Sequence, residues 1–397
     1  MNATATITKN RITSIDFLRG TIMIIMALDH VRDYLFFGSF YFDPLDLTKT
    51  SGALFFTRWI THFCAPIFLL LAGTSAYLMG RKKSKSELSV FLVKRGLWLV
   101  LLEMIVVNFG WNFNPAFPMF FFITIWALGV SMIALAALIH LPKRLLLVLS
   151  IAIIAGHNLL DHIHVPGNTL AGFGWSLLHD QQFFTWHNEM LLVGYPIIPL
   201  FAIMSLGYCL GELFTSEFDT AKRKKILATV GFSALALFVV LRYSNIYGDP
   251  VKWSTQKDGF FTFLSFLNVN KYPPSLLYVL LTIGSACVFL AFAEKVQNGV
   301  VKVVSVYGRV PMFYYLIHIY IIHLIAVISS AVTPGQDWHR WLMDKPIWFT
   351  TNLKGYGFSL PVTYLIWIAI VVGLYPLCKK YDAYKQKHKE KWWLSYL

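Results

Sequence analysis

Long apolar stretches separated by short polar connections dominate the pattern of this chain. A membrane-spanning helix needs about 20 consecutive, mainly apolar residues, and stretches of this length recur throughout the sequence. We expect about ten spans, at residues 14–37, 54–80, 88–110, 119–140, 144–160, 191–213, 226–243, 275–294, 307–333 and 359–379. The pattern therefore predicts an all-α, polytopic membrane protein that forms a single domain over residues 1–397.

Composition supports this class and argues against another. The chain is 57% hydrophobic and only 14% charged, and its mean hydropathy is +0.59, as in membrane proteins. A formal net charge of +14 is compatible with a nucleic-acid partner. The basic residues, however, form short clusters between apolar segments, which is typical of cytoplasmic loops. We therefore expect the lipid bilayer, and no nucleic acid, as the partner of this surface.

The placement of the basic clusters predicts the orientation of the chain. They comprise residues 81–85, 94–95, 143–144 and 222–225 and the tail after Cys378. With a cytoplasmic N-terminus, all of these clusters share one side, and the opposite side keeps only about ten of the 34 basic residues. We therefore predict that both termini are cytoplasmic, with a short N-terminal segment at 1–13 and a basic tail at 380–397.

The first span carries ionisable residues along one face. Arg19 and His30 are eleven positions apart, so a helix brings them within roughly 20° of each other and about 16 Å apart along its axis. Asp16 and Asp33 extend this stripe, and Asp29 is close enough to orient the imidazole. Because charged groups are costly in hydrocarbon, they usually face a protein interior and serve a function. We interpret this face as the wall of a cavity, with His30 as general base; a structural network that holds helices together is the alternative.

The starts of two further predicted spans carry basic side chains that are candidates for binding a phosphate group. Arg309 begins the ninth span, where its guanidinium suits phosphate geometry. Lys94 and Arg95 begin the third span on the same side, although basic residues there also serve as topology determinants. Within the ninth span, His318 lies near mid-membrane and is a candidate pore residue. His323, five residues later, is about 140° further around the helix, so both histidines cannot face one cavity.

The outer side carries a second group of candidates. His62 lies at the outer end of the second span, the level expected for His30, and is the second choice for the base. Residues 156–168, GHNLLDHIHVPGN, form a polar cluster with Asp161 and His162, and His179, His187 and Glu189 follow. The spacings invite a metal interpretation, but no cysteine or HExxH pattern accompanies them. We expect no metal, and we interpret this loop as acceptor-binding or structural.

Several segments, in conserved order along the chain, resemble the bacterial relatives of heparan-alpha-glucosaminide N-acetyltransferase. They are RITSIDFLRGTIMIIMALDHVRDY at 11–34, THFCAPIFLLLAGTSAYL at 61–78, GHNLLD at 156–161, YPIIPLFAIMSLGYCLG at 195–211, YGDP with Trp253, KYPPSLLY at 271–278 and YGRVPMFYYLIHIYIIH at 307–323. The arginine, ten residues and histidine also resemble the signature of the integral-membrane O-acyltransferases of bacterial surface glycans. The resemblance covers almost the whole chain.

This resemblance implies an acetyltransferase of the bacterial inner membrane that takes acetyl-CoA, or another acyl-CoA, from the cytoplasm. The acceptor would be a sugar amine or hydroxyl on the outer side, and a second copy of the chain is a further expected partner. The sequence departs from the family at one point. The lysosomal enzyme carries its catalytic histidine in the loop after the first span and an asparagine where this chain has His30. Here residues 38–52 contain no histidine, so His30 is the expected base.

The residues and the resemblance together predict one model. Arg309, Lys94, Arg95 and Arg19 hold the polyanionic CoA, while His318, Asp161 and His162 contribute to the acceptor site. His30 then acts as a base or forms an acyl-histidine intermediate, and both routes remain open. The first alternative is a proton-coupled transporter in which His30, Asp33 and His318 form a relay. The second is a non-catalytic membrane partner protein.

Overall fold

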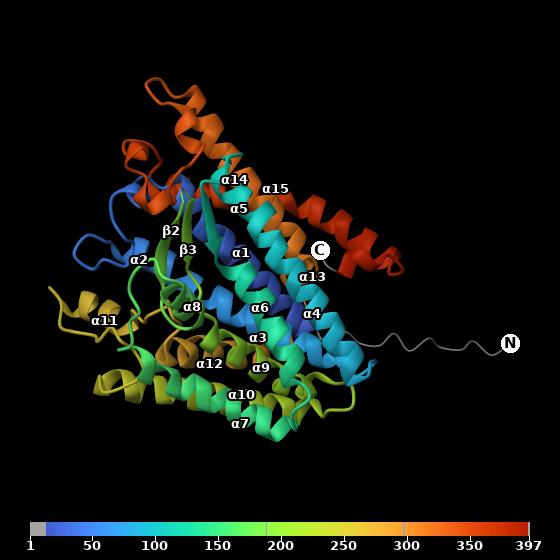
Figure 1. Ribbon diagram of the computed structural model, residues 1–397. Helices are drawn as coiled ribbons and strands as arrows, with labels where there is room; N and C mark the ends of the chain where they lie inside the picture. Colours follow the sequence, from blue (N-terminus) through green and yellow to red (C-terminus); the bar gives the residue numbers. More distant parts are fainter. Residues whose placement is uncertain (1–12, 188, 297, 396–397) are drawn as a thin grey trace.

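Most of the predicted spans are helices in the computed structural model, which describes residues 13–187, 189–296 and 298–395 (Figure 1). Within these residues, seven helical segments are long and apolar enough to cross a bilayer. They are Gly52–Gly80, Lys143–Leu160, Ile197–Phe214, Thr220–Ser244, Leu276–Ala293, Pro311–Val332 and Leu360–Lys387. The chain is therefore a multi-pass integral membrane protein. The predicted N-terminal segment, except residue 13, lies outside the described residues.

The first half of the chain contributes the central helix and its neighbours. Its helices are α1 (Thr13–Leu35), α2 (Gly52–Trp59), α3 (Cys64–Gly80), α4 (Lys85–Leu102), α5 (Asn108–Asn112), α6 (Thr124–Leu138), α7 (Lys143–Gly156) and α8 (Leu170–Leu178). A single 3₁₀ turn joins α2 to α3, and a π-helical turn joins α4 to α5. Ser84 and Glu87 form a capping box that fixes the start of α4.

The second half adds the outer helices and the ninth predicted span. Its helices are α9 (Ile197–Leu210), α10 (Thr220–Ser244), α11 (Gly259–Leu267), α12 (Leu276–Ala293), α13 (Gly299–Arg309), α14 (Pro311–Val332) and α15 (Leu360–Lys387). The helical path breaks at Val310, because Pro311 has no N–H to continue a preceding helix and starts a new one. Residues 307–310 of the ninth predicted span thus belong to the end of α13 and the break.

A small mixed sheet corrects the all-α prediction. Strand β3 (Glu189–Val193) lies between β1 (Met119–Phe122), to which it is parallel, and β2 (Gln182–Trp186), to which it is antiparallel. The starts of the predicted spans 119–140 and 191–213 therefore belong to strands. Runs as short and apolar as MFFF at 119–122 carry no periodicity that separates a strand from the first turn of a helix.

Helix α1 runs through the centre of the bundle (Figure 1) and packs against α13, α14, α15 and α3. Gly20 and Gly308 form its closest crossing, because a Cβ atom on either would collide with the backbone of the other helix. Small residues at crossings let membrane helices approach closely. This crossing places Arg309 next to the first turns of α1. By contrast, α7, α10 and α15 expose most of their apolar residues, as lipid-facing helices do.

Candidate functional site

One cavity opens beside the N-terminal half of α1 and combines positive charge with apolar walls. Its volume is about 490 Å³. Five basic side chains line it, Arg19, Arg95, Arg309, Lys385 and Lys389, together with one acid, Asp382. Five methionines contribute most of the flexible apolar wall: Met23, Met26, Met79, Met132 and Met312. We call it the basic cavity. The last turn of α15 and the residues after it supply two of the cations, which sequence reasoning had assigned only a topological role.

Two arginines of the basic cavity are held by neighbouring helices. Arg19 donates to the carbonyl of Gly308 at 3.1 Å and to Ser75 Oγ at 3.1 Å. The Nε of Arg309 donates to Asp382 Oδ2 at 2.8 Å. Within the described part of the chain, the Arg309 Nη groups have no hydrogen-bond partner. The guanidinium is therefore positioned by one edge while its other edge keeps donors for a ligand.

A second cavity, of about 640 Å³, opens beside the C-terminal half of α1. It is lined by His30, by four basic side chains (Arg32, Arg58, Lys271 and Lys354) and by three acids (Asp29, Asp33 and Asp43). Seven aromatic residues complete its wall: Phe40, Tyr41, Phe42, Trp111, Tyr195, Tyr272 and Phe349. We call it the histidine cavity. Aromatic faces beside hydrogen-bonding charged groups suit a polar ring-shaped ligand such as a sugar.

Ion pairs occupy the carboxylates around His30. Asp29 contacts Arg32 at 2.8 Å and Arg58 at 2.9 Å, while Asp33 contacts Arg32 at 2.5 Å. Because both carboxylates form ion pairs with arginines, Asp29 and Asp33 are not free to orient the imidazole alone, the role that the sequence predicts for them. Positive charge also reaches the far wall. Burial would raise the pKa of the Tyr272 phenol, but Lys271 and Arg58 outweigh it and lower this pKa below its ordinary value.

His30 and His318 form a hydrogen-bonded pair. The Nδ1 of His30 lies 2.8 Å from the Nε2 of His318, and the two rings are nearly parallel. The His318 Nδ1 lies 2.8 Å from the carbonyl oxygen of Tyr314. Since a carbonyl only accepts, this Nδ1 carries the proton, and the neutral His318 accepts at Nε2. His30 must then donate from Nδ1, which leaves its Nε2 lone pair available on the side of the histidine cavity.

The two cavities meet next to this pair. Thr124, the first residue of α6, lines both of them. On α1, Met26 lines the basic cavity and His30, one turn later, lines the histidine cavity. Tyr315 lines the basic cavity, and its ring packs edge-on against His30 with centroids 6.1 Å apart. The His30 imidazole thus lines the histidine cavity at a point close to the wall of the basic cavity.

Other predicted site residues lie elsewhere. His62 is fully buried against Tyr278 and lines neither cavity. Lys94 is exposed, also outside both linings, whereas its neighbour Arg95 faces the basic cavity. His318 lines neither cavity itself, and His323, which contacts the backbone carbonyls of Gly110 and Trp341, also lies outside both linings.

The polar cluster at residues 156–168 is likewise separate. Asp161 adjoins His179 and His162 is exposed; neither lines the two cavities.

The comparisons with known proteins address the family directly. The family model "Heparan-alpha-glucosaminide N-acetyltransferase, catalytic" matches residues 11–242, more than half of the chain. The chain belongs to this family. No curated protein matches it. In this member of the N-acetyltransferase family, the match contains Arg19, His30 and Arg95 and ends before Arg309 and His318. The family resemblance predicted from the motifs is therefore confirmed, while the site also draws on helices beyond the matched region.

Sequence reasoning missed several wall residues of this family member. Thr124, Trp111 and Lys354 come from a helix start, a short helix and a loop, and no local pattern marks them. Lys271 and Tyr272 did carry a signal, since KYPPSLLY at 271–278 is one of the segments that resemble the family. Their role as wall residues depends on the loop that folds back over the cavity.

Proposed function

We propose that this protein is a membrane acyltransferase that moves an acetyl group from acetyl-CoA to an amine or hydroxyl of a sugar. One observation carries this proposal: His30 lines the aromatic, polar cavity and packs against Tyr315, which lines the basic cavity at the other end of α1. The family name, that of an N-acetyltransferase, gives the reaction class. A donor and an acceptor entering from opposite sides would meet at this histidine.

The proposed topology puts the basic cavity at the cytoplasmic face of the bacterial inner membrane. We infer ten spans and cytoplasmic termini; beyond the seven apolar segments, these include α1, α4 with α5, and α6. The basic cavity then shares the side of residues 81–85 and the tail, as the distribution of positive charge requires. Acetyl-CoA is available there, and the histidine cavity faces outward, where the acceptor enters.

In the donor site, we assign the phosphates of CoA to the basic side chains. Arg309, with free Nη donors, and Arg95 suit phosphate oxygens, and the two lysines beyond Asp382 add positive charge at the mouth. Arg19 lies deeper and is fixed by Ser75 and Gly308. The methionine-rich wall adapts to the flexible pantetheine arm, which extends toward His30.

The chemistry follows from the tautomer of His30. Its Nε2 accepts the proton of the acceptor amine or hydroxyl, whose N or O attacks the thioester carbonyl. The C–S bond then breaks, and the His30 imidazolium returns the proton to the leaving sulfur, so that CoA departs as the thiol. His318 accepts the Nδ1–H throughout and stabilises the imidazolium that forms. In an acyl-histidine route, Nε2 would instead attack the thioester carbonyl, the C–S bond would break and the CoA thiolate would leave; the acceptor would then take the acetyl group from Nε2 and restore the histidine. Both routes use the same tautomer of His30, with the proton on Nδ1 and the lone pair on Nε2.

The test is an acetyl-transfer assay with the purified full-length protein. Labelled acetyl-CoA is incubated with a panel of amino sugars and neutral sugars, and label on the acceptor is measured. We expect transfer by the wild type and a loss of about 10²–10⁴-fold in kcat for His30→Ala. His62→Ala is the matched control, a buried histidine outside both cavities. Equal transfer by His30→Ala would remove His30 from the mechanism.

The same assay separates the enzyme from the transporter alternative. A relay of His30 and His318 would use the same hydrogen bond, but Asp33, its third member, is engaged by Arg32. Proteoliposomes that move protons with a sugar, without labelling any acceptor in the presence of acetyl-CoA, would favour transport. Label on an acceptor that depends on His30 favours transfer.

A further inference from the structure

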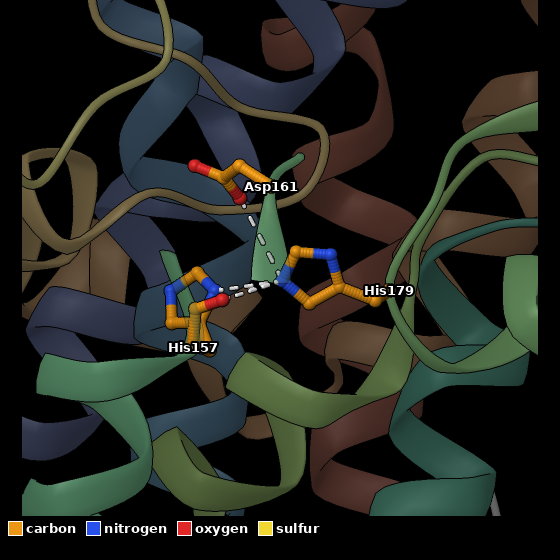
Figure 2. A group of neighbouring side chains, drawn as sticks. All are labelled: His157, Asp161 and His179. Carbon is orange, nitrogen blue, oxygen red and sulfur yellow. Dashed lines mark hydrogen bonds and ion pairs between the residues drawn. The ribbon is translucent and has the colours of Figure 1, made fainter. Parts of the chain in front are cut away.

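Three polar side chains converge at the outer end of α7, away from both cavities (Figure 2). His157 opens the 3₁₀ turn that follows α7, Asp161 ends that turn, and His179 immediately follows α8. The two histidines are each 3% exposed, while the Asp161 side chain is 19% exposed. The group is therefore enclosed on the histidine side and open to solvent on the carboxylate side.

The distances within this group match a metal site. The Nδ1 of His157 lies 3.3 Å from the Nε2 of His179, and Asp161 Oδ1 lies 3.7 Å from the same Nε2. All three ligand atoms fall within 4.8 Å of one another. Zinc bonds to nitrogen and oxygen measure about 2.0–2.2 Å, so two ligands at a tetrahedral angle lie about 3.3–3.6 Å apart. Small side-chain rotations would bring the three atoms to these positions.

Hydrogen bonding leaves this group incompletely satisfied. The His179 Nε2 faces three atoms at once: His157 Nδ1, Asp161 Oδ1 and, at 2.9 Å, the His157 carbonyl oxygen (Figure 2). One N–H cannot serve all three. The buried Asp161 Oδ1 has no hydrogen-bond partner in the described part of the chain, whereas the His157 ring also contacts the Pro274 backbone. Such an orphaned buried atom calls for an explanation, and a cation between the ligands supplies one.

The surroundings favour a cation and hold the carboxylate in place. No Lys or Arg occurs from residue 157 to residue 189. Asn158 donates to Asp161 Oδ2 at 2.7 Å, which leaves Oδ1 aimed at the histidines. The Oδ1 of Asn158 in turn accepts from the Leu276 backbone N–H at 2.8 Å, which ties the turn to the start of α12. Outer contacts of this kind orient metal ligands.

We propose that His157, Asp161 and His179 bind a zinc ion. Two imidazoles and one carboxylate are a zinc donor set, and the open side next to Asp161 leaves the fourth position to water. Imidazole ligands argue against Ca²⁺ and Mg²⁺, which prefer oxygen alone. When zinc binds, the proton on the His179 Nε2 moves to Nδ1 or to solvent, and the bond to the His157 carbonyl is given up.

The zinc would act as a clip in the outer loop. It joins the turn that follows α7 to the residue that follows α8, and residues 161–169 link that turn to the start of α8. Gln181, two residues after His179, lines the histidine cavity, and β2 follows directly. Holding His179 therefore fixes one wall of that cavity. The metal is assigned this structural role, and its presence does not depend on the acyl-transfer proposal.

Metal binding by the full-length protein, purified without a histidine tag and stripped with a chelator, tests this assignment. We expect one Zn²⁺ per chain in competition with a chromophoric chelator, and visible absorption bands of a tetrahedral site when Co²⁺ replaces zinc. Asp161→Asn and His179→Gln should each weaken zinc binding by about 100-fold or more. His164→Gln is the control, because His164 is an exposed histidine of the same loop bonded to Asp180.

X-ray absorption of the wild-type zinc complex gives an answer without any variant. Two imidazole ligands with oxygen neighbours support the site. Absence of stoichiometric zinc, or zinc bound equally by wild type, Asp161→Asn and His179→Gln, overturns it. Melting temperature supplies a further readout: zinc should raise it for wild type and His164→Gln and leave it unchanged for His179→Gln.

Discussion

The basic cavity and the histidine cavity lie along the same helix but differ in how their charge is arranged. In the basic cavity, cations outnumber the single acid, Asp382, and the remaining wall is apolar and rich in methionine. In the histidine cavity, acids and bases nearly balance, and several of them pair with each other between aromatic rings. An excess of positive charge attracts a polyanion, whereas balanced charge beside aromatic faces suits a neutral polar ring.

This difference indicates that the two cavities bind different ligands. Helix α1 runs from one cavity to the other and so sets the distance between the two ligands. Arg19 lines the first and His30 the second, so the stripe predicted from sequence divides between two spaces that adjoin at Thr124. Substitutions can then be sorted by which ligand they affect. A change in the basic cavity should alter KM for the donor, one in the histidine cavity KM for the acceptor, and one at the junction kcat.

Blocking the junction should have the largest effect. Thr124→Trp fills the position that both cavities share, and we expect transfer to fall by at least about 100-fold because reacting groups are held apart. The start of α6 should survive, since Glu103 accepts the backbone N–H groups of Ile125 and Trp126. The measurement is kcat together with acetyl-CoA binding by calorimetry.

Two controls sharpen that experiment. Thr124→Ser keeps the space open and should transfer like the wild type. Leu128→Trp narrows only the basic cavity, so its main effect should be on donor binding. Full activity of Thr124→Trp, in a protein that still binds acetyl-CoA, would mean that donor and acceptor do not meet at this junction.

Removing the partner of His30 should have the next largest effect. His318→Phe keeps an aromatic ring but cannot accept the Nδ1–H of His30, which then is free to change tautomer. A hydrogen bond to a charged group contributes about 1.5–3 kcal/mol, so kcat should fall about 10- to 100-fold. KM for acetyl-CoA should stay unchanged, because His318 does not line the basic cavity. Unchanged kcat with His318→Phe would mean that this hydrogen bond does not support the base.

Much of the fold could be predicted from sequence, because bilayer thickness and backbone hydrogen bonding restrict the choices. Hydropathy found the long apolar helices, and the spacing of Arg19 and His30 gave their common face of α1. Neither hydropathy nor residue spacing could show which helices would pack against each other. The pairing of His30 with His318 joins residues far apart in the sequence, and the strands at Met119–Phe122 and Glu189–Val193 depend on each other for hydrogen bonds.

The candidate site was predicted best where a residue's role depends on its own helix. Arg95 and Lys94 show the limit, since they are adjacent in sequence and were predicted to act together. Successive residues on a helix point about 100° apart, so only Arg95 faces the basic cavity while Lys94 is exposed. Loop residues such as Lys354 could not be placed, because no periodicity fixes where an outer loop folds back.

The smallest expected effect concerns the donor alone and compares Arg309, inside the basic cavity, with Lys94, outside it. Arg309→Gln removes a guanidinium that lines the basic cavity and that we assign to a CoA phosphate, so KM for acetyl-CoA should rise about tenfold, the loss of one partly exposed phosphate contact. KM for the acceptor should not move. Lys94→Gln is the matched control: it removes one positive charge from the same end of the bundle, but outside the cavity. If Lys94→Gln raised the donor KM as much as Arg309→Gln, general attraction by the basic face, rather than contacts in the basic cavity, would govern CoA binding.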